Sequence, residues 1–218
     1  MSILTKEQKL FLDLFSKDKV LASSFYLTGG TALAEFYIPY RYSDDLDFFS
    51  ESEVYTQGIL TTIKKYKTKL GYKSIEFNTS FNRNLFFLDF GNNYTLKTEF
   101  TYFPFPQIEK RKPANGLVID SALDIAVNKL FTIYQKPRSR DFMDLYMLNK
   151  EYGYKIDGLV SKARSKFDWH IDPVKLGSQF LLSTELKDYP KLLKPMGEKE
   201  WLDYFINEAR NLGEKILE

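Results

Sequence analysis

Two aspartates, Asp45 and Asp47, stand two residues apart where acidic and apolar residues alternate across residues 43–49. Alternation is typical of a strand, in which every second side chain leaves the same face. The two carboxylates would then lie about 6.6 Å apart on one face, where they repel each other unless a cation lies between them. Oxygen ligands suit Mg²⁺, so the segment predicts a magnesium site. A solvated strand edge or a turn is the alternative interpretation.

A glycine pair upstream adds a second indication. The apolar run of residues 25–27 predicts a short strand that ends at Gly29 and Gly30, and residues 31–37 predict a helix rich in Ala and Leu. Glycine backbone can approach a phosphate closely, and the first N–H groups of the helix would point at the same place. Thr31 adds a hydroxyl. Most glycine pairs are only turns, but a phosphate cradle followed 15 residues later by an acid pair is more specific.

A third carboxylate would complete a site in which two metal ions clamp the attacking and leaving oxygens of a phosphoryl transfer. Residues 84–90 and 95–103 predict the two strands of a hairpin that turns at residues 91–93. Glu99, in the second strand, is our first choice for the third acid, and Asp89, in the first strand, is the runner-up. Either residue could instead be an exposed strand acid.

The second half of the chain contributes a lysine and an aspartate in unusual positions. Residues 121–135 predict a helix with a capping box at its start, and Lys129 falls within its apolar stripe. A lysine on an apolar face extends its charged end to water, pairs with a carboxylate or binds a phosphate. Asp141 shares a face with apolar residues of a second helix. It could be an acid favoured by the helix dipole, the partner of Lys129, or a catalytic group.

The elements that position these residues divide into two groups. The first half of the chain mixes strands with helices, including a lysine-rich helix whose apolar residues recur over residues 59–70. Three prolines between residues 104 and 113 interrupt regular structure, and from residue 120 onward the pattern is helical. We therefore predict an α+β fold, with an α/β domain over residues 1–117 and an α-helical domain over residues 118–218.

Composition narrows the chemistry. The 218 residues contain no Cys and one His, His170, which excludes thiol nucleophiles, disulfides, Cys-ligated zinc and multi-histidine metal sites. The net charge of +2 demands no polyanionic partner. No segment has the roughly 20 apolar residues of a membrane span, and the polar start differs from a signal peptide. We expect a soluble, cytoplasmic protein.

Taken together, these segments resemble the AbiEii/AbiGii-type nucleotidyltransferase toxin family, within the DNA polymerase β-like nucleotidyltransferase superfamily. One departure is Tyr40-Arg41, where relatives often carry His-Arg. The resemblance implies the superfamily's mixed sheet with flanking helices, followed by an α-helical C-terminal domain. The matching segments, which agree in order and approximate spacing, are Leu27–Leu33, Arg41–Phe49, Asp124–Lys129 and Arg140–Leu145.

The resemblance also implies an activity, the Mg²⁺-dependent transfer of a nucleoside monophosphate from an NTP to an acceptor hydroxyl, with pyrophosphate leaving. The family's glycine motif falls on Gly29, Gly30 and Thr31, and its metal carboxylates fall on Asp45 and Asp47. Its downstream lysine matches Lys129, and its later aspartate matches Asp141. We expect Glu99 to be a third metal ligand that helps deprotonate the acceptor, and Ser43 to join the glycine motif in nucleotide binding. Lys129 would neutralise charge on the triphosphate, and Asp141 would position Lys129 or assist as a base.

Members of this family are typically toxins of two-gene toxin–antitoxin or phage-abortive systems, and some modify tRNA. The resemblance therefore implies an NTP, an RNA acceptor such as tRNA and an antitoxin encoded nearby as partners. Basic stretches at residues 64–73, 110–112 and 136–140 are compatible with tRNA. Two alternatives stay open, namely a small-molecule or protein nucleotidyltransferase and a non-catalytic NTP- or RNA-binding protein on the same fold.

Overall fold

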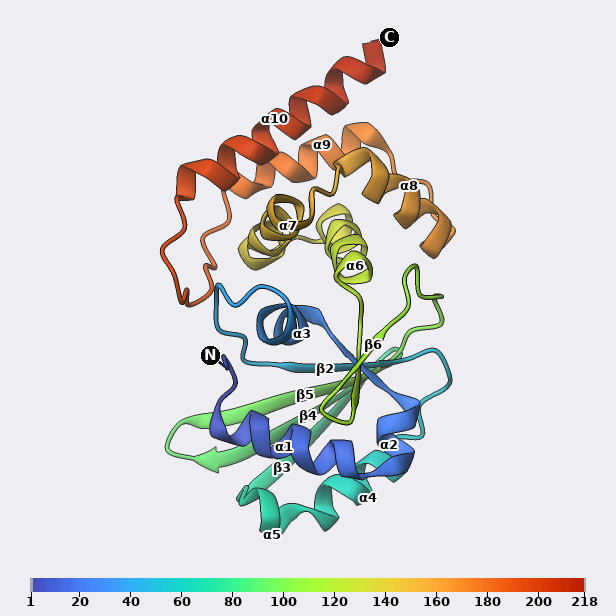
Figure 1. Cartoon of the computed structure of the whole chain (residues 1–218), viewed down its shortest axis with the longest axis vertical. Coiled ribbons are helices and arrows are strands. Elements are labelled where there is room, and N and C mark those ends of the chain that lie inside the picture. The colour runs from blue at the N-terminus through green and yellow to red at the C-terminus, as the bar shows by residue number, and fades with distance from the viewer. Residues whose placement is uncertain (1, 218) are drawn as a thin grey trace. The chain divides into compact units, whose positions relative to one another are not determined.

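The computed structural model describes residues 2–217, with side chains through residue 214. It contains two compact units, each described here by itself (Figure 1). The first unit comprises the chain through Pro106 together with Lys110–Ser121, and the second comprises Gln107–Glu109 and the chain from Ala122 onward. The first unit holds all the strands found among the described residues, and the second is built of helices. No helix of the described part of the chain is long and apolar enough to span a bilayer.

The first unit is built on a seven-stranded mixed sheet, counted over the described residues, with strand order β3-β4-β5-β2-β1-β7-β6. Strand β2 runs antiparallel to β1 and parallel to β5, so Asp47 is flanked by Thr28 on one side and Glu99 on the other. The sheet confirms the predicted mixed sheet with flanking helices. The strands are β1 (Tyr26–Thr28), β2 (Leu46–Ser50), β3 (Ser74–Ser80), β4 (Arg83–Gly91), β5 (Tyr94–Tyr102), β6 (Lys112–Ala114) and β7 (Leu117–Ile119).

One face of the sheet carries the core of this unit. Phe48 is fully buried and stacks against both Phe15 of α1 and Phe100 of β5, with ring centroids 4.3 and 4.9 Å away. Because side chains alternate along β2, burying Phe48 and Leu46 on this face directs Asp47 to the opposite face. Figure 1 shows the helices α1 (Lys6–Lys17), α2 (Lys19–Ser24), α4 (Thr56–Lys65) and α5 (Lys67–Leu70) on the core face and α3 (Gly29–Phe36) on the other.

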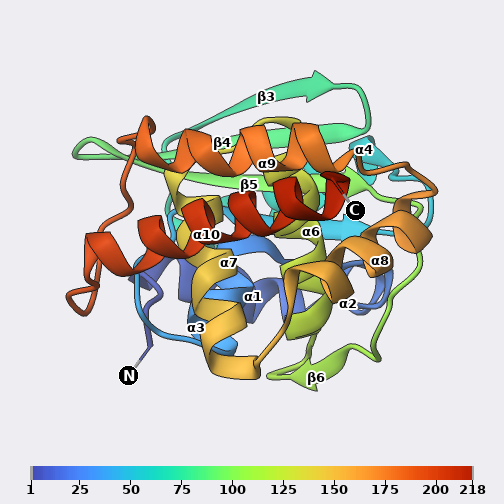
Figure 2. The same cartoon turned by 90° about the horizontal axis from the view of Figure 1, so that it is seen from above.

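The second unit packs its helices around aromatic side chains. Phe205 contacts Phe142 and Phe180, with ring centroids 4.9 and 5.2 Å away, and all three rings are fully buried. Figure 2 shows α9 and α10 running side by side. The elements are α6 (Ala122–Gln135), α7 (Ser139–Tyr152), α8 (Ile156–Phe167), α9 (Pro173–Leu181), the 3₁₀ turn η1 (Leu182–Thr184) and α10 (Glu198–Leu217).

Several elements differ from the sequence expectation. Strand β3 was not predicted, because it is an edge strand whose side chains are almost all exposed and so has no alternating pattern. The short hairpin of β6 and β7 forms within the proline-containing stretch, where Pro113 is accepted because β6 lies at the sheet edge. Helix α3 begins at Gly29 rather than at Thr31, so the glycine pair forms its first turn.

Asp124 attaches the segment 107–109 to the helical unit. Its buried carboxylate accepts hydrogen bonds from the backbone N–H groups of Ile108 and Glu109, at 2.9 and 3.0 Å. It also pairs with the buried ammonium of Lys166, with Nζ 2.7 Å from Oδ1. A carboxylate with three donors inside an apolar region acts as a fixed anchor, since each donor would otherwise lose a hydrogen bond.

We expect Asp124→Asn to lower the free energy of unfolding by about 3–5 kcal/mol, because it removes the carboxylate from a buried ammonium. Urea unfolding measures this change. The double variant Asp124→Asn/Lys166→Met is the control, and it should recover part of the loss. A double variant whose loss equals the sum of the two single losses would contradict the coupling.

Candidate functional site

The acid pair lies at the start of β2. Asp47 is the second residue of the strand, and Asp45 lies one residue before the strand begins. The prediction that both aspartates lie on the strand is therefore correct for Asp47 and wrong by one residue for Asp45. Both aspartates are half-buried. The carboxylate of Asp45 pairs with Lys97 of β5, with Nζ 2.9 Å from Oδ2. Asp47 therefore projects from the face of the sheet opposite the aromatic core, and Asp45 is held next to the strand by Lys97.

The glycine pair lies against this acid segment. Gly29 has a φ of +71°, a left-handed conformation that side chains other than glycine rarely adopt. A Cβ atom at Gly29 would overlap the carboxylate of Asp47, and one at Gly30 would overlap the guanidinium of Arg41 and lie 3.0 Å from Oγ of Ser43. Only glycine lets the first turn of α3 approach the acids this closely.

Two further side chains hold the acid segment in place. The hydroxyl of buried Thr31 donates to the backbone carbonyl of Asp45. The amide of Gln8, in α1, donates to the carbonyls of Ser43 and Asp44 at 2.7 and 3.0 Å. Thr31 thus supports the acid segment, whereas its contact with nucleotide stays a prediction, as does that of Ser43.

Glu99 lies beside Asp47 in the register of β5 and β2 and is only 5% exposed. Both of its oxygens accept from Arg83 of β4, with Nε and Nη2 each 2.6 Å away, and Thr101 donates to the same carboxylate. Burial alone would raise the pKa of Glu99, but the hydrogen bonds and charge of Arg83 outweigh it and hold the pKa below its usual value. Glu99 is therefore ionised and already paired.

Arg83 is the functional candidate that sequence reasoning missed. Its pKa is raised, first by the hydrogen bonds that it donates to Glu99 and further by the charges of Glu99, Asp47 and Asp45, although burial opposes the shift. Asp89, the runner-up third acid, lies on β4 four residues after Leu85, which is the cross-strand neighbour of Glu99. Its carboxylate accepts a hydrogen bond from the N–H of Gly91 at the end of β4. That position leaves Glu99 as the acid beside the pair.

The helical unit brings Lys129 and Asp141 together, so the interpretation of Asp141 as the partner of Lys129 is correct. Nζ of Lys129 lies 2.7 Å from Oδ1 of Asp141 and 2.7 Å from Oδ2 of Asp144, and both acids are fully buried. Arg138 adds a guanidinium contact to Asp141 at 3.0 Å. Burial would raise the pKa of Asp141, but the charges of Lys129 and Arg138 together lower it. Catalytic roles for Lys129 and Asp141 stay predictions.

The comparisons with known proteins agree with this geometry. The family model of the nucleotidyl transferase AbiEii toxin, type IV TA system, matches residues 12–207. The chain belongs to the AbiEii family. It is 31% identical over 149 residues to the uncharacterized protein aq_aa25 of Aquifex aeolicus, covering 67% of this chain and 68% of that protein. As an AbiEii-type protein, the chain is a nucleotidyltransferase, and the recognition from sequence is confirmed.

Solved structures show the same fold as this AbiEii-type chain. A Helicobacter pylori protein assigned as a nucleotidyltransferase superposes with a TM-score of 0.63 at 24% identity, covering 97% of both chains. The protein JHP933 from Helicobacter pylori gives a TM-score of 0.62 at 24% identity, covering 97% of this chain and 94% of that one. At this identity the likeness concerns the fold.

The donor set of the AbiEii-type site fits a metal held partly by substrate. No group of three His, Cys, Asp or Glu side chains within the described residues is arranged to hold a metal ion. Asp45, Asp47 and Glu99 are the carboxylates of the candidate site, and the structure pairs Asp45 with Lys97 and Glu99 with Arg83. Mg²⁺ is usually bound by one or two carboxylates together with substrate phosphates, and the acid pair fits that pattern.

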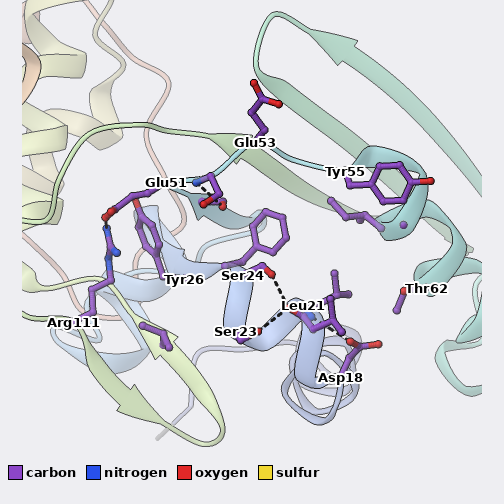
Figure 3. Close-up of a pocket in the computed structure, with 17 residues that line it drawn as sticks. Asp18, Leu21, Ser23, Ser24, Tyr26, Glu51, Glu53, Tyr55, Thr62 and Arg111 are labelled. Atoms are coloured by element: carbon purple, nitrogen blue, oxygen red, sulfur yellow. Dashed lines mark hydrogen bonds and ion pairs between the residues drawn. The ribbon is translucent and has the colours of Figure 1, made fainter.

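A cavity of about 630 Å³ lies elsewhere in the first unit, at the other end of β1 and β2 (Figure 3). Tyr26 and Ser50 line it, whereas Thr28 and Asp47 mark the opposite end of the same two strands. The guanidinium of Arg111 stacks 3.5 Å from the ring centroid of Tyr26. None of the predicted site residues lines this cavity.

The glycine contact can be tested with a matched pair of alanine substitutions. Gly71 has a φ of +82° and open space around it, so Gly71→Ala should cost only the left-handed backbone strain, about 1–2 kcal/mol. Gly29→Ala adds the overlap with Asp47 to that strain. We expect both variants to lose stability in urea unfolding and only Gly29→Ala to lose nucleotide transfer. Equal transfer by the two variants would contradict the close contact.

The pairing of Lys129 predicts a pH-dependent stability. Because the folded pKa of Asp141 is lowered, its ion pairs stabilise the protein above the ordinary carboxyl pKa of about 4, and this contribution is lost as the pH falls through the folded value. We expect Lys129→Met to cost about 3–5 kcal/mol at neutral pH, with a smaller cost only well below pH 4, as the pH falls toward the lowered folded pKa of Asp141. Urea unfolding across this range measures it, and Lys150→Met, at an exposed pair, is the control that should change little. A cost independent of pH would refute the assignment.

Proposed function

We propose that this AbiEii-type chain transfers a nucleoside monophosphate from an NTP to an acceptor hydroxyl, with tRNA as the acceptor and Mg²⁺ as the metal. The observation that carries the proposal is the close contact between the first turn of α3 and the acid segment, which sets the start of this helix beside the carboxylate of Asp47. The helix N-terminus attracts phosphate, and the carboxylates attract a divalent cation. Together these groups suit a metal-bound triphosphate.

In this proposal, different residues of the first unit bind the metal, the phosphates and the acceptor. Asp45 and Asp47 would hold Mg²⁺, which when bound neutralises charge on the phosphates. Gly29 and Gly30 would offer their backbone N–H groups to the β- and γ-phosphates. Glu99 would act on the acceptor side, beside Asp47 in the register of the sheet.

The balance of the reaction is as follows. The acceptor oxygen forms a bond to the α-phosphorus, and the bond from that phosphorus to the bridging oxygen breaks. Pyrophosphate leaves with the bonding electrons, and the acceptor proton passes to a base, for which a carboxylate at this position is the candidate. For direct metal ligation or proton transfer, Glu99 would need at least one oxygen released by Arg83.

The biological setting follows from family membership. A toxin–antitoxin family implies that an antitoxin controls the enzyme, and we propose that this chain is the toxin of such a system with a role in abortive infection. The roles expected for Lys129, which would neutralise charge on the triphosphate, and for Asp141 belong to the same proposal. A small-molecule or protein acceptor, and a non-catalytic binding protein, are the competing outcomes of the test.

The test is incubation with each α-labelled NTP, Mg²⁺ and either total tRNA or lysate protein. We expect label on tRNA, and we expect Asp47→Ala to reduce the rate roughly 100-fold or more, since a metal ligand supplies several kcal/mol of transition-state stabilisation. The control Asp44→Asn removes an exposed neighbouring acid and should retain transfer. Label on protein, or on neither acceptor, would redirect the assignment, and full activity in Asp47→Ala would refute the acid pair.

A further inference from the structure

Two carboxylates of the candidate site, those of Glu99 and Asp45, already form ion pairs with basic side chains of the chain itself. Arg83 holds Glu99 through two contacts of 2.6 Å, and Lys97 holds Asp45 through one of 2.9 Å. Arg83 lies on β4, next to the strand β5 that carries Glu99, and Lys97 lies on β5, next to the strand β2 that Asp45 precedes. Adjacent carboxylates that bind a divalent ion repel each other when the ion is not bound. Other cations must then neutralise their charge.

We propose that Arg83 and Lys97 are exchangeable counter-cations: a divalent ion takes their place on the carboxylates, and the released guanidinium of Arg83 then binds a phosphate of the acceptor strand. The second step rests on the proposed function, because it assumes an acceptor that carries phosphates. The first step concerns this chain and a metal ion alone.

The exposure of the partners makes such an exchange feasible. The side chain of Arg83 is 51% exposed, whereas that of Glu99 is only 6% exposed. The arginine can therefore move toward solvent while the acid stays in place. Removing Arg83 with no replacement would strand a buried charge at a cost of several kcal/mol, so the pair opens only when another cation takes over. At equal distance a divalent ion attracts a carboxylate twice as strongly as a monovalent one.

The choice of an arginine points to the second role. A guanidinium presents parallel N–H groups that match two oxygens of a carboxylate, and the same fork matches two oxygens of a phosphate. Arg83 now uses Nε and Nη2 in this way on Glu99. A released Arg83 would carry that fork beside the acid expected to face the acceptor. Lys97, a single point charge, would serve mainly to neutralise Asp45.

Metal binding to the full chain tests the exchange without nucleotide or turnover. Mn²⁺ serves as the probe, and its free concentration is followed by electron paramagnetic resonance. Because the competing cation is gone, Arg83→Met and Lys97→Met should each bind Mn²⁺ about threefold to tenfold more tightly than the wild type. Lys64→Met removes an exposed lysine of α4 and controls for net charge. Affinities equal to that of this control would overturn the exchange.

Binding of a short single-stranded RNA, followed by fluorescence anisotropy, tests the released arginine. We expect the wild type to bind this RNA more tightly with Mn²⁺ than without, and Arg83→Met to lose part of that gain together with about one unit of the salt slope. Glu99→Gln should free Arg83 without metal and so strengthen metal-free binding. Unchanged RNA binding in both variants would overturn the phosphate role.

The two proposals fail separately. A wild type that shows metal-dependent RNA binding but labels no acceptor would refute the proposed transfer and leave the exchange standing. A wild type that labels tRNA but whose Arg83→Met variant matches it in both Mn²⁺ and RNA binding would refute the exchange and leave the transfer standing.

Discussion

The close approach of Gly29 to the carboxylate of Asp47 is the constraint on which the site depends. It requires a backbone with φ of +71° and no side chain at that position, and it joins β1, α3 and β2 at one point. The pairing of Thr28 with Asp47 sets the register of this junction, and the hydroxyl of Thr31 secures the segment that precedes the strand. A helix N-terminus and two acids are thereby held together by backbone geometry.

The second organising principle is charge balance. Glu99 and Asp45 in the first unit are paired with Arg83 and Lys97, and Asp141 in the second unit is paired with Lys129 and Arg138. The two groups differ in exposure. Asp141 and Asp144 are fully buried around a lysine that is itself only 8% exposed, which favours a permanent pair. Arg83 and Lys97 face solvent in part, which favours cations that can leave.

The residues that could be predicted from sequence are those whose signal is local. Asp45, Asp47 and the glycine pair lie within 19 residues, and strand alternation is enough to place Asp47 opposite the core. Glu99 was found because its hairpin has clear alternation. Arg83 was missed because its importance comes from pairing across two strands, which depends on register and not on its neighbours in sequence. Strand β3 was missed because its two faces are both exposed, so no hydrophobic period marks it.

The contacts of Asp141 bear on which of its three interpretations holds. A general base must carry a pKa near the working pH and must reach the proton that it removes. Asp141 is fully buried, its pKa is lowered, and its oxygens accept from Lys129 and Arg138. It also accepts from the backbone N–H of Arg138, as a cap at the start of α7. A carboxylate with these partners is a poor base, whereas it is well suited to orient an ammonium, so positioning of Lys129 is the interpretation that the physical chemistry favours.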